Sequence, residues 1–172
     1  MGQQSEVAFT AFVDEYGDGL ARFARLLTAS PHDAEDLLQA ALLKVFRRWS
    51  NAAPAPVAYT KTTLVNLAKD GYRSRSLNDL PVAELPHNDS APDIAIAIAA
   101  QAQIEHLLAG LPPRQRVTVV LRVLDGHSTD ETAALMSCSV GTVKSNLARG
   151  LERLRESIES SAARTPTTEV RS

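Results

Sequence analysis

Apolar side chains recur at steps of three and four residues through the first fifty residues of the chain, a spacing typical of amphipathic helices. The first series runs from Phe9 to Leu27 and the second from Ala34 to Trp49. Between them stand Ser30, Pro31 and Asp33. A serine that caps backbone amides, a proline in the first turn and an acid three residues after the cap are favoured at a helix start. The pattern predicts two helices that share a core.

Prolines divide the rest of the N-terminal half. Residues 51–56, which contain Pro54 and Pro56, are expected to break the second helix, because proline lacks an amide hydrogen and restricts the residue before it. A third helix is predicted from about Val57 to Ser74. Residues 76–92 combine three prolines with polar turn formers and contain no basic residue. That composition predicts a flexible linker.

Two further helices are predicted directly after the linker. Residues 93–110 contain isoleucines that alternate as in a strand, but the alanines and the length favour a helix. Pro113 suits the first turn of the next helix, and Gly126 suits its end. This helix is expected to bury one apolar face, formed by Val117, Val120, Leu121 and Leu124.

Residues 127–155 have the pattern of a helix-turn-helix. Ser128 and Glu131 have the spacing of a capping box, in which each side chain bonds a free backbone amide of the other residue. A short helix follows, then a turn at residues 137–139, then a longer helix. Two helices around a tight turn form this motif. The longer helix is expected to bury Val140, Val143, Leu147, Leu151 and Leu154.

Length and composition agree with an all-α protein made of two small helical domains. The chain has 172 residues, of which 44% are hydrophobic and only 5% aromatic. We predict an N-terminal domain at 5–75, a linker at 76–92, a C-terminal domain at 93–160 and a disordered tail at 161–172. Cys138 is the single cysteine, so no internal disulfide can form. No apolar run approaches the roughly 20 residues that span a bilayer, and no signal-peptide pattern is present, so a cytoplasmic location is expected.

The net charge of −2 conceals two basic segments. Residues 51–75 hold four basic residues and one acid, and residues 112–155 hold seven and four. Residues 76–111, which lie between them, hold five acids and no Lys or Arg. Because salt screens charge beyond about 10 Å, nucleic acid responds to such local surfaces rather than to the net charge.

The last predicted helix projects polar and basic residues away from its apolar face. Such residues can reach base edges and phosphates in a major groove of DNA. A helical hairpin with a solvated basic face explains the same pattern, and the residues alone leave both explanations open. The outward residues are Thr142, Lys144, Ser145, Asn146, Arg149 and Arg153.

Two blocks of motifs resemble the extracytoplasmic-function sigma factors of bacterial RNA polymerase, in particular the actinobacterial SigE-type group. Residues 111–117 (LPPRQRV), 121–122 (LR) and 138–145 (CSVGTVKS) are similar to the fourth conserved region of that family. Residues 34–39 (AEDLLQ), 45–49 (VFRRW), 58–59 (AY) and 66–73 (NLAKDGYR) are similar to its second region. Both blocks occur in the family's order, and the resemblance covers roughly residues 9–157. It implies a factor that binds core polymerase and directs promoter recognition, DNA melting and transcription initiation.

The third predicted helix then becomes the candidate reader of the unwound minus-ten strand, together with the loop at residues 50–56. An aromatic ring can stack on a base, an amide can read its edge, and cations can hold phosphates. Five polar residues recur at steps of four and three and form one stripe: Tyr59, Thr63, Asn66, Asp70 and Arg73. Lys61, Lys69 and Arg75 add positive charge near it. A solvated helix face is the alternative explanation.

The resemblance also implies the remaining contacts. The start of the second helix would bind the clamp helices of the largest polymerase subunit through Glu35, Asp36, Leu38, Gln39 and Leu42. The outward residues of the last helix would read the minus-thirty-five element, and the beta flap would bind the C-terminal domain. An anti-sigma factor is a further partner that the sequence leaves open. Ser137 stands where the family's turn usually has glycine, so strained backbone is expected there.

Other functional classes explain less of the chain. A stand-alone helix-turn-helix regulator is the main alternative, but it leaves residues 34–39 and 59–73 unexplained. An enzyme is not expected, because no candidate nucleophile has an adjacent base. The four histidines are scattered, so neither a metal site nor a cofactor is predicted. For the acidic linker we hypothesise that Asp79, Glu84 and Asp89 mimic nucleic acid in the polymerase cleft and influence promoter escape; a solvated tether is the simpler alternative.

Overall fold

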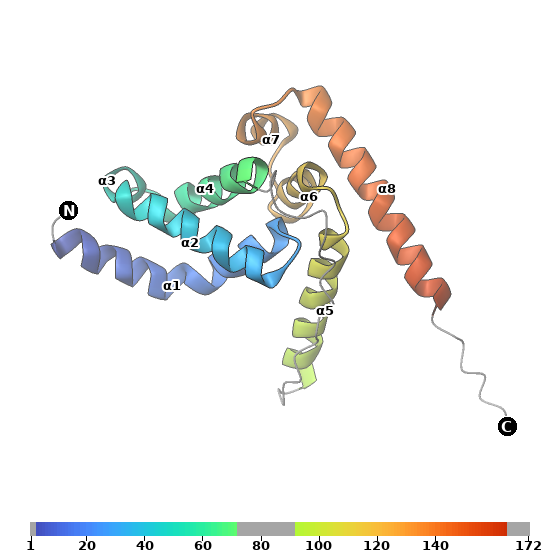
Figure 1. Ribbon diagram of the computed structural model, residues 1–172, viewed down its shortest axis with the longest axis horizontal. Helices are drawn as coiled ribbons and strands as arrows, with labels where there is room; N and C mark the ends of the chain where they lie inside the picture. Colours follow the sequence, from blue (N-terminus) through green and yellow to red (C-terminus); the bar gives the residue numbers. More distant parts are fainter. Residues whose placement is uncertain (1–2, 72–91, 165–172) are drawn as a thin grey trace.

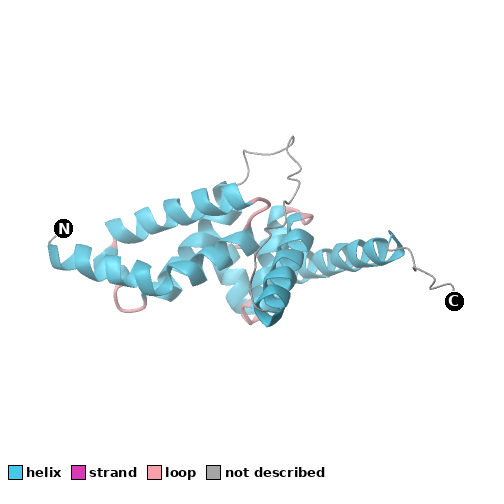
Figure 2. Ribbon diagram, turned by 90° about the horizontal axis from the view of Figure 1, so that it is seen from below, coloured by secondary structure: helices cyan, strands magenta, loops and turns pink. Residues whose placement is uncertain are grey.

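The computed structural model describes residues 3–71 and 92–164, and every element within them is helical, as predicted (Figures 1 and 2). The N-terminal unit contains α1 (Gln3–Leu27), α2 (Pro31–Arg47), α3 (Trp49–Ala52) and α4 (Pro56–Gly71). The C-terminal unit contains α5 (Pro92–Ala109), α6 (Pro113–Val119), the π-helical turn η1 (Val120–Leu124), α7 (Thr129–Met136) and α8 (Val140–Arg164). The acidic residues of the predicted linker, Asp79, Glu84 and Asp89, lie outside the described residues.

Aromatic side chains hold α1 against α2 and α3. The Phe9 ring lies 4.9 Å from the Phe46 ring and 5.3 Å from the indole of Trp49, measured between centroids. Trp49 is buried, and α2 ends at Arg47, shortly before it. The helix thus ends before the break predicted at residues 51–56, and the predicted loop at 50–56 begins within the short helix α3.

A buried arginine joins α5 to α6. The Arg116 guanidinium donates hydrogen bonds of 2.8 Å to the carbonyl oxygens of Leu108, Ala109 and Leu111. Helices end with free carbonyls, and a cation is favoured there. Burial lowers the pKa of Arg116 to about 10, so the side chain remains charged at neutral pH. Arg116 therefore caps the end of α5 and fixes the corner between the two helices.

The helix-turn-helix has the local features that the sequence predicts. Ser128 caps α7, and the reciprocal bonds of the capping box are both present, from Glu131 N–H to Ser128 Oγ (3.1 Å) and from Ser128 N–H to Glu131 Oε2 (2.6 Å). Ser137 ends α7 in the left-handed conformation, with φ of 50°. A side chain with a Cβ is disfavoured there, which confirms the expected strain.

The two units pack on one another through a continuous core. Buried residues of α1, α2 and α4 belong to the same cluster as those of α6 and η1. In Figure 1, α4 lies beside α6 and α7, while α8 extends away from the N-terminal unit. Between α1 and α5, Arg25 Nε lies 3.1 Å from Glu105 Oε1.

Some predicted core positions are wrong. Leu124, Val140 and Leu151 are exposed, whereas Val117, Val120, Leu121 and Val143 are buried. The π-helical turn shifts the residues after Val120 relative to an α-helical period, which turns Leu124 outward. The predicted tail is also wrong in part, because α8 continues to Arg164.

Close packing of α8 on α6 depends on Gly150. A Cβ at this position would lie 2.8 Å from Val119 Cγ2, which belongs to a buried side chain with little freedom to move. We expect Gly150→Ala to be destabilising, because a clash of about 1–3 kcal/mol exceeds the gain of about 1 kcal/mol in helix propensity. Thermal denaturation followed by circular dichroism should show a melting temperature lower by a few degrees.

Gly141→Ala is the matched control in the same helix. Its nearest neighbour would be Ser139 Oγ at 3.7 Å, an ordinary contact. We expect an unchanged or slightly higher melting temperature for this variant. Equal effects of the two substitutions would contradict the packing role of Gly150.

The capping box should make stability depend on pH. The backbone hydrogen bond from Ser128 lowers the pKa of the exposed Glu131 below its ordinary value of 4.5. A lowered pKa means that the stabilisation is complete above that ordinary value and is lost as the pH falls through the folded-state pKa. Glu131→Ala should therefore lower the melting temperature at pH 7, and the difference from the parent protein should shrink in acid. Glu152→Ala, in the middle of α8, is the control; the same pH-dependent difference there would contradict the assignment.

Candidate nucleic-acid and polymerase interfaces

The helix α4 presents three faces, because its residues turn by about 100° each. Thr60, Leu64 and Ala68 are buried on the side that packs on the other helices of the N-terminal unit. Lys61 and Val65 lie toward the C-terminal unit, where they line a cleft. The third face carries Tyr59, Thr63 and Asn66. Packing on two sides therefore fixes the direction of the third face.

The predicted minus-ten stripe lies on this third face. Asn66 is exposed, while Tyr59 and Thr63 are half-buried, and the Thr63 hydroxyl donates to the Tyr59 carbonyl at 2.8 Å. The side chain of Asp70 and the residues Arg73 and Arg75 lie outside the described part of the chain. The amide of Asn66 is thus accessible, while the Tyr59 ring lies on the same line and is partly covered by the core on which it packs.

The two lysines predicted to accompany the stripe point elsewhere. The Lys61 ammonium forms an ion pair with Asp125, which follows η1. The Lys69 ammonium donates to the carbonyl of Leu135 at 2.8 Å and to Ser137 Oγ at 3.1 Å. Both lysines therefore contact the C-terminal unit in this structure. The sequence pattern did not predict this, because their partners lie 64 and 66 residues away along the chain.

The predicted minus-thirty-five residues all lie on α8. Lys144, Ser145, Arg149 and Arg153 are exposed, while Thr142 and Asn146 are half-buried. Two bonds order the start of the helix, from Thr142 N–H to Ser139 Oγ (3.1 Å) and from the Ser145 hydroxyl to the Thr142 carbonyl (3.0 Å). Lys144 stands about 140° around the helix from Arg149, since five residues separate them. The predicted residues therefore occupy two sides of α8 rather than one stripe.

The predicted polymerase-binding residues border an apolar groove between α1 and α2. Gln39 and Leu42 line it, together with Glu6, Phe9, Thr10, Leu43 and Phe46. Glu35 is exposed and lies on the same side of α2 as Gln39, while Leu38 is half-buried. Asp36 lies about 60° around the helix from Gln39 and nearly in line with Leu43, at the edge of the groove, where it is 3.7 Å from His32 Nε2. Leu43 is about half exposed, so the groove presents apolar surface that no other part of the described chain covers.

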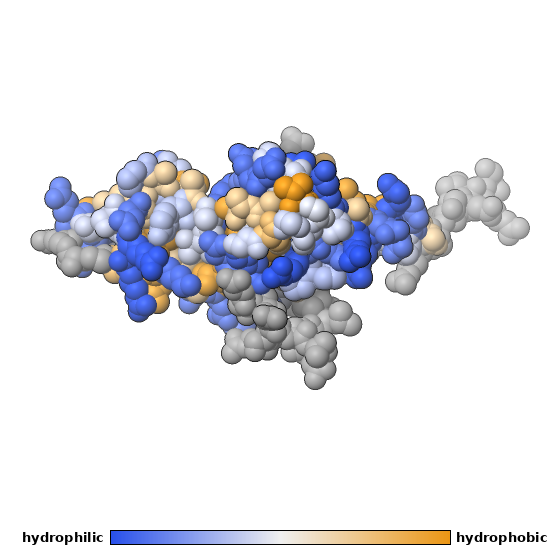
Figure 3. All heavy atoms as spheres, turned by 90° about the horizontal axis from the view of Figure 1, so that it is seen from above, coloured by the Kyte–Doolittle hydropathy of each residue, from blue (hydrophilic) through white to orange (hydrophobic). Residues whose placement is uncertain are grey.

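Elsewhere the surface is mixed in character. Figure 3 shows separate apolar areas with hydrophilic residues between them. Among residues 3–71 and 92–164, no group of three or more His, Cys, Asp or Glu side chains is arranged to hold a metal ion. No helix in the same two ranges is both long and apolar enough to cross a membrane.

Comparisons with known proteins agree with both halves of the structure. The family model described as Sigma-70 region 2 matches residues 12–77, and the model described as Sigma-70, region 4 matches residues 101–154. The RNA polymerase sigma-E factor of Streptomyces avermitilis is 40% identical over 162 residues, which cover 93% of this chain and 90% of that protein. The ECF RNA polymerase sigma factor SigE of Mycolicibacterium smegmatis is 31% identical over 90% of this chain and 63% of that protein.

The fold has a solved counterpart. The sigma factor RpoE from Bartonella quintana, in complex with the anti-sigma factor NepR, superposes with a TM-score of 0.63 at 25% identity, over 88% of this chain and 96% of that one. A fold, two family regions in order and close relatives thus agree. The chain belongs to the sigma-70 family of RNA polymerase sigma factors, within its extracytoplasmic-function branch and close to the SigE-type factors.

Proposed function

We propose that this sigma factor binds core RNA polymerase through the α1–α2 groove, the unwound minus-ten strand through the free face of α4, and the minus-thirty-five duplex through α8. One observation carries the proposal. Each of the three predicted residue sets has a member exposed on a helix within a matched sigma region, namely Gln39 on α2, Asn66 on α4 and Arg149 on α8. A stand-alone helix-turn-helix regulator has no use for the first two surfaces, and it is not favoured.

The α1–α2 groove fits a protein partner. Protein interfaces bury an apolar centre inside a polar rim. Here Phe9, Leu42 and Phe46 supply apolar surface, while Glu6 and Gln39 supply polar groups at its edge. A helix laid into such a groove would bury apolar side chains and meet carboxylate and amide groups beside them. The clamp helices of the largest polymerase subunit are the partner that we propose.

The free face of α4 fits single-stranded DNA. Tyr59 offers a ring for stacking, and Asn66 offers an exposed amide that can both donate and accept hydrogen bonds. Unpaired bases expose their faces and edges, whereas a duplex hides the faces. The face is therefore suited to a melted strand, which matches a role in promoter opening.

The exposed residues of α8 fit duplex DNA. Arg149 and Arg153 lie one turn apart on the same side, so both can reach one groove or the phosphates beside it. Residues at the start of the helix, such as Ser145, would lie nearest the bases if the N-terminal end enters the groove. We further propose that the polymerase beta flap binds the C-terminal unit. An anti-sigma factor is a candidate partner as well, because RpoE was solved with one.

Polymerase binding can be tested at α2. We expect Asp36→Arg to weaken assembly with core polymerase about tenfold or more, because a reversed charge against a complementary surface costs over 1 kcal/mol. Gln39→Ala should weaken it less. The measurement is titration of labelled factor with core enzyme. Asp18→Arg, on the exposed side of α1, is the control and should bind normally. Full assembly by the Asp36 variant would contradict the proposed docking face.

Promoter reading can be tested at α8. We expect Arg149→Ala to reduce holoenzyme binding to a promoter duplex by about 1–3 kcal/mol if the arginine contacts a base, with relaxed specificity at one position. A phosphate contact would instead lower affinity for all sequences and reduce the salt dependence. Arg155→Ala is the matched control, because Arg155 is exposed about 120° around the helix from Arg149. Binding that is unchanged for the Arg149 variant at several salt concentrations would show that this side of α8 does not face DNA.

A further inference from the structure

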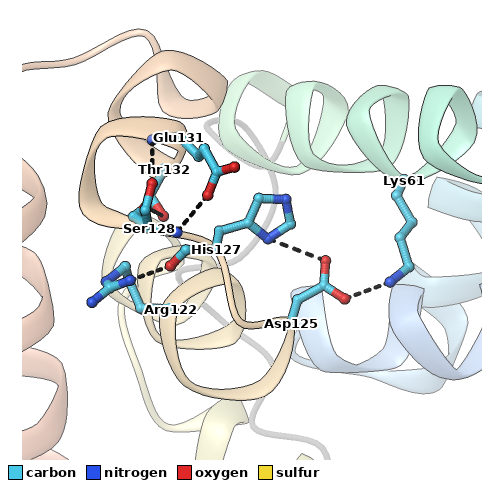
Figure 4. Close-up of polar contacts among 7 residues, drawn as sticks. All are labelled: Lys61, Arg122, Asp125, His127, Ser128, Glu131 and Thr132. Atoms are coloured by element: carbon cyan, nitrogen blue, oxygen red, sulfur yellow. Dashed lines mark hydrogen bonds and ion pairs between the residues drawn. The ribbon is translucent and has the colours of Figure 1, made fainter.

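Lys61 is held by one contact from each unit. Its ammonium forms an ion pair with the Asp125 carboxylate of the C-terminal unit (Figure 4). It also lies 4.8 Å from the centre of the Phe23 ring of α1, within the range of a cation–π contact. The Lys61 side chain is 35% exposed and that of Asp125 is 17% exposed. The positive charge of Lys61 is therefore paired, and the side chain is partly removed from water, unlike that of a freely solvated surface lysine.

Asp125 is firmly placed to receive that lysine. Its backbone N–H donates to the Val120 carbonyl at 2.9 Å, which closes the π-helical turn. His127 follows, with its N–H bonded to the Leu121 carbonyl at 2.9 Å, its Nδ1 3.4 Å from Asp125 Oδ2 and its carbonyl bonded by Arg122 (Figure 4). Ser128 then begins the capping box of α7. The acceptor thus belongs to a corner that is fixed by backbone bonds.

Lys69 forms a second contact of the same kind, two turns further along α4. It donates to the Leu135 carbonyl and to Ser137 Oγ at the C-terminal end of α7. Helix C-termini carry free carbonyls and partial negative charge, so they attract a cation. The C-terminal unit therefore offers α4 two anionic or dipolar acceptors, and each one holds a lysine.

The interface between the units is suited to opening. A cleft of about 430 Å³ lies beside the ion pair and is lined by Phe23, Val65, Leu121 and Leu135 among others. A partly open ion pair contributes only about 0–1 kcal/mol, so each contact is weak and reversible. The two units must also reach two separate promoter elements, and this compact arrangement holds them together.

We propose that the Lys61–Asp125 pair and the Lys69 contacts with α7 form an autoinhibitory latch, which withholds phosphate-binding cations from the minus-ten face of the free factor. The inference rests on the function proposed for α4. In the closed state Asn66 and the rest of the free face remain accessible, but the two nearby amines are bound to the chain's own acceptors. Single-stranded DNA depends on such cations for affinity. Separation of the units releases both amines beside the face that reads the bases.

The latch makes a quantitative expectation for the free factor. When only a fraction of the molecules is competent to bind, the apparent affinity falls by that fraction. Full-length Asp125→Asn removes the acceptor charge and should bind a fluorescent single-stranded oligonucleotide about three- to fivefold more tightly than the parent protein, measured by anisotropy at low salt. Asp130→Asn changes the net charge equally at an exposed position of α7 and should not gain affinity. Equal binding by the two variants would overturn the latch.

Lys61→Ala separates the latch from simple charge effects. It also breaks the ion pair, but it removes one of the two amines that the latch releases. Lys61→Ala should therefore gain less affinity than Asp125→Asn, and combined with Asp125→Asn it should reduce the gain, because only Lys69 is then released. A gain of undiminished size in the double variant would also overturn the proposal. Thermal melts establish that the variants fold, and Asp125→Ser serves in place of Asp125→Asn if that variant does not, since serine is accepted in turns.

Asn66→Ala distinguishes the failure of the latch from the failure of the function on which it rests. If this variant binds the oligonucleotide more weakly while Asp125→Asn and Asp130→Asn bind it with equal affinity, the proposed minus-ten face is supported and the latch is wrong. If Asn66→Ala and Lys61→Ala both leave binding unchanged in the presence of Asp125→Asn, α4 does not bind the strand and both proposals fall. Tighter binding by Asp125→Asn, with loss through Asn66→Ala, supports both.

Discussion

The structure depends on a single constraint at α4, which must satisfy neighbours on two sides while a third side stays accessible. Thr60, Leu64 and Ala68 are buried on one side, and Val65 on another is almost completely buried as well. A helix packed in this way cannot rotate about its axis without exposing apolar surface, at a cost of about 25 cal/mol for each Å². The orientation of the free face is therefore a result of core packing, and its polar residues need no bonds of their own to hold it.

Much of the fold follows from local patterns in the sequence. The periodic apolar series predicted α1, α2 and α4, and the capping box at Ser128 and Glu131 gave the start of α7 correctly. Two of the errors arose where the backbone leaves the α-helical period, since Leu124 turns outward after the π-helical turn and α2 ends at Arg47, before the buried Trp49. Neither departure has a signal in the spacing of apolar residues, which assumes a constant helical period. Val140 and Leu151 are exposed within the regular helix α8, because the apolar spacing of one helix does not show how much of it a neighbouring helix covers.

The candidate site was predictable by residue but not by environment. The polar stripe identified Asn66 on α4 and the outward face of the last helix identified Arg149 on α8, and the structure shows both exposed. Lys61 and Lys69 were assigned to DNA from their charge near the stripe, which did not indicate that each contacts the other unit. The residue pattern of a helix indicates which faces are polar and which are apolar, but it does not indicate which other part of the chain packs on each face. The role of Arg116 was missed for a related reason. Its acceptors are backbone carbonyls, which every residue has, so no particular residue type in the sequence indicates them.

Gly150 affects the direction of the helix α8 as well as the stability of the fold. Residues 140–149 span about 15 Å of α8 before Gly150, because each helical residue adds about 1.5 Å. This part of the helix contains the buried Val143, and α8 packs on α7 as well as on α6. A tilt of about 10° at Gly150 would move the start of the helix by roughly 2–3 Å, far more than the few tenths of an ångström that a hydrogen bond tolerates. Gly150 lies only about 40° around the helix from Asn146 and about 60° from Arg153, so the close approach at a residue without a side chain bears directly on where the residues that we propose to contact DNA point.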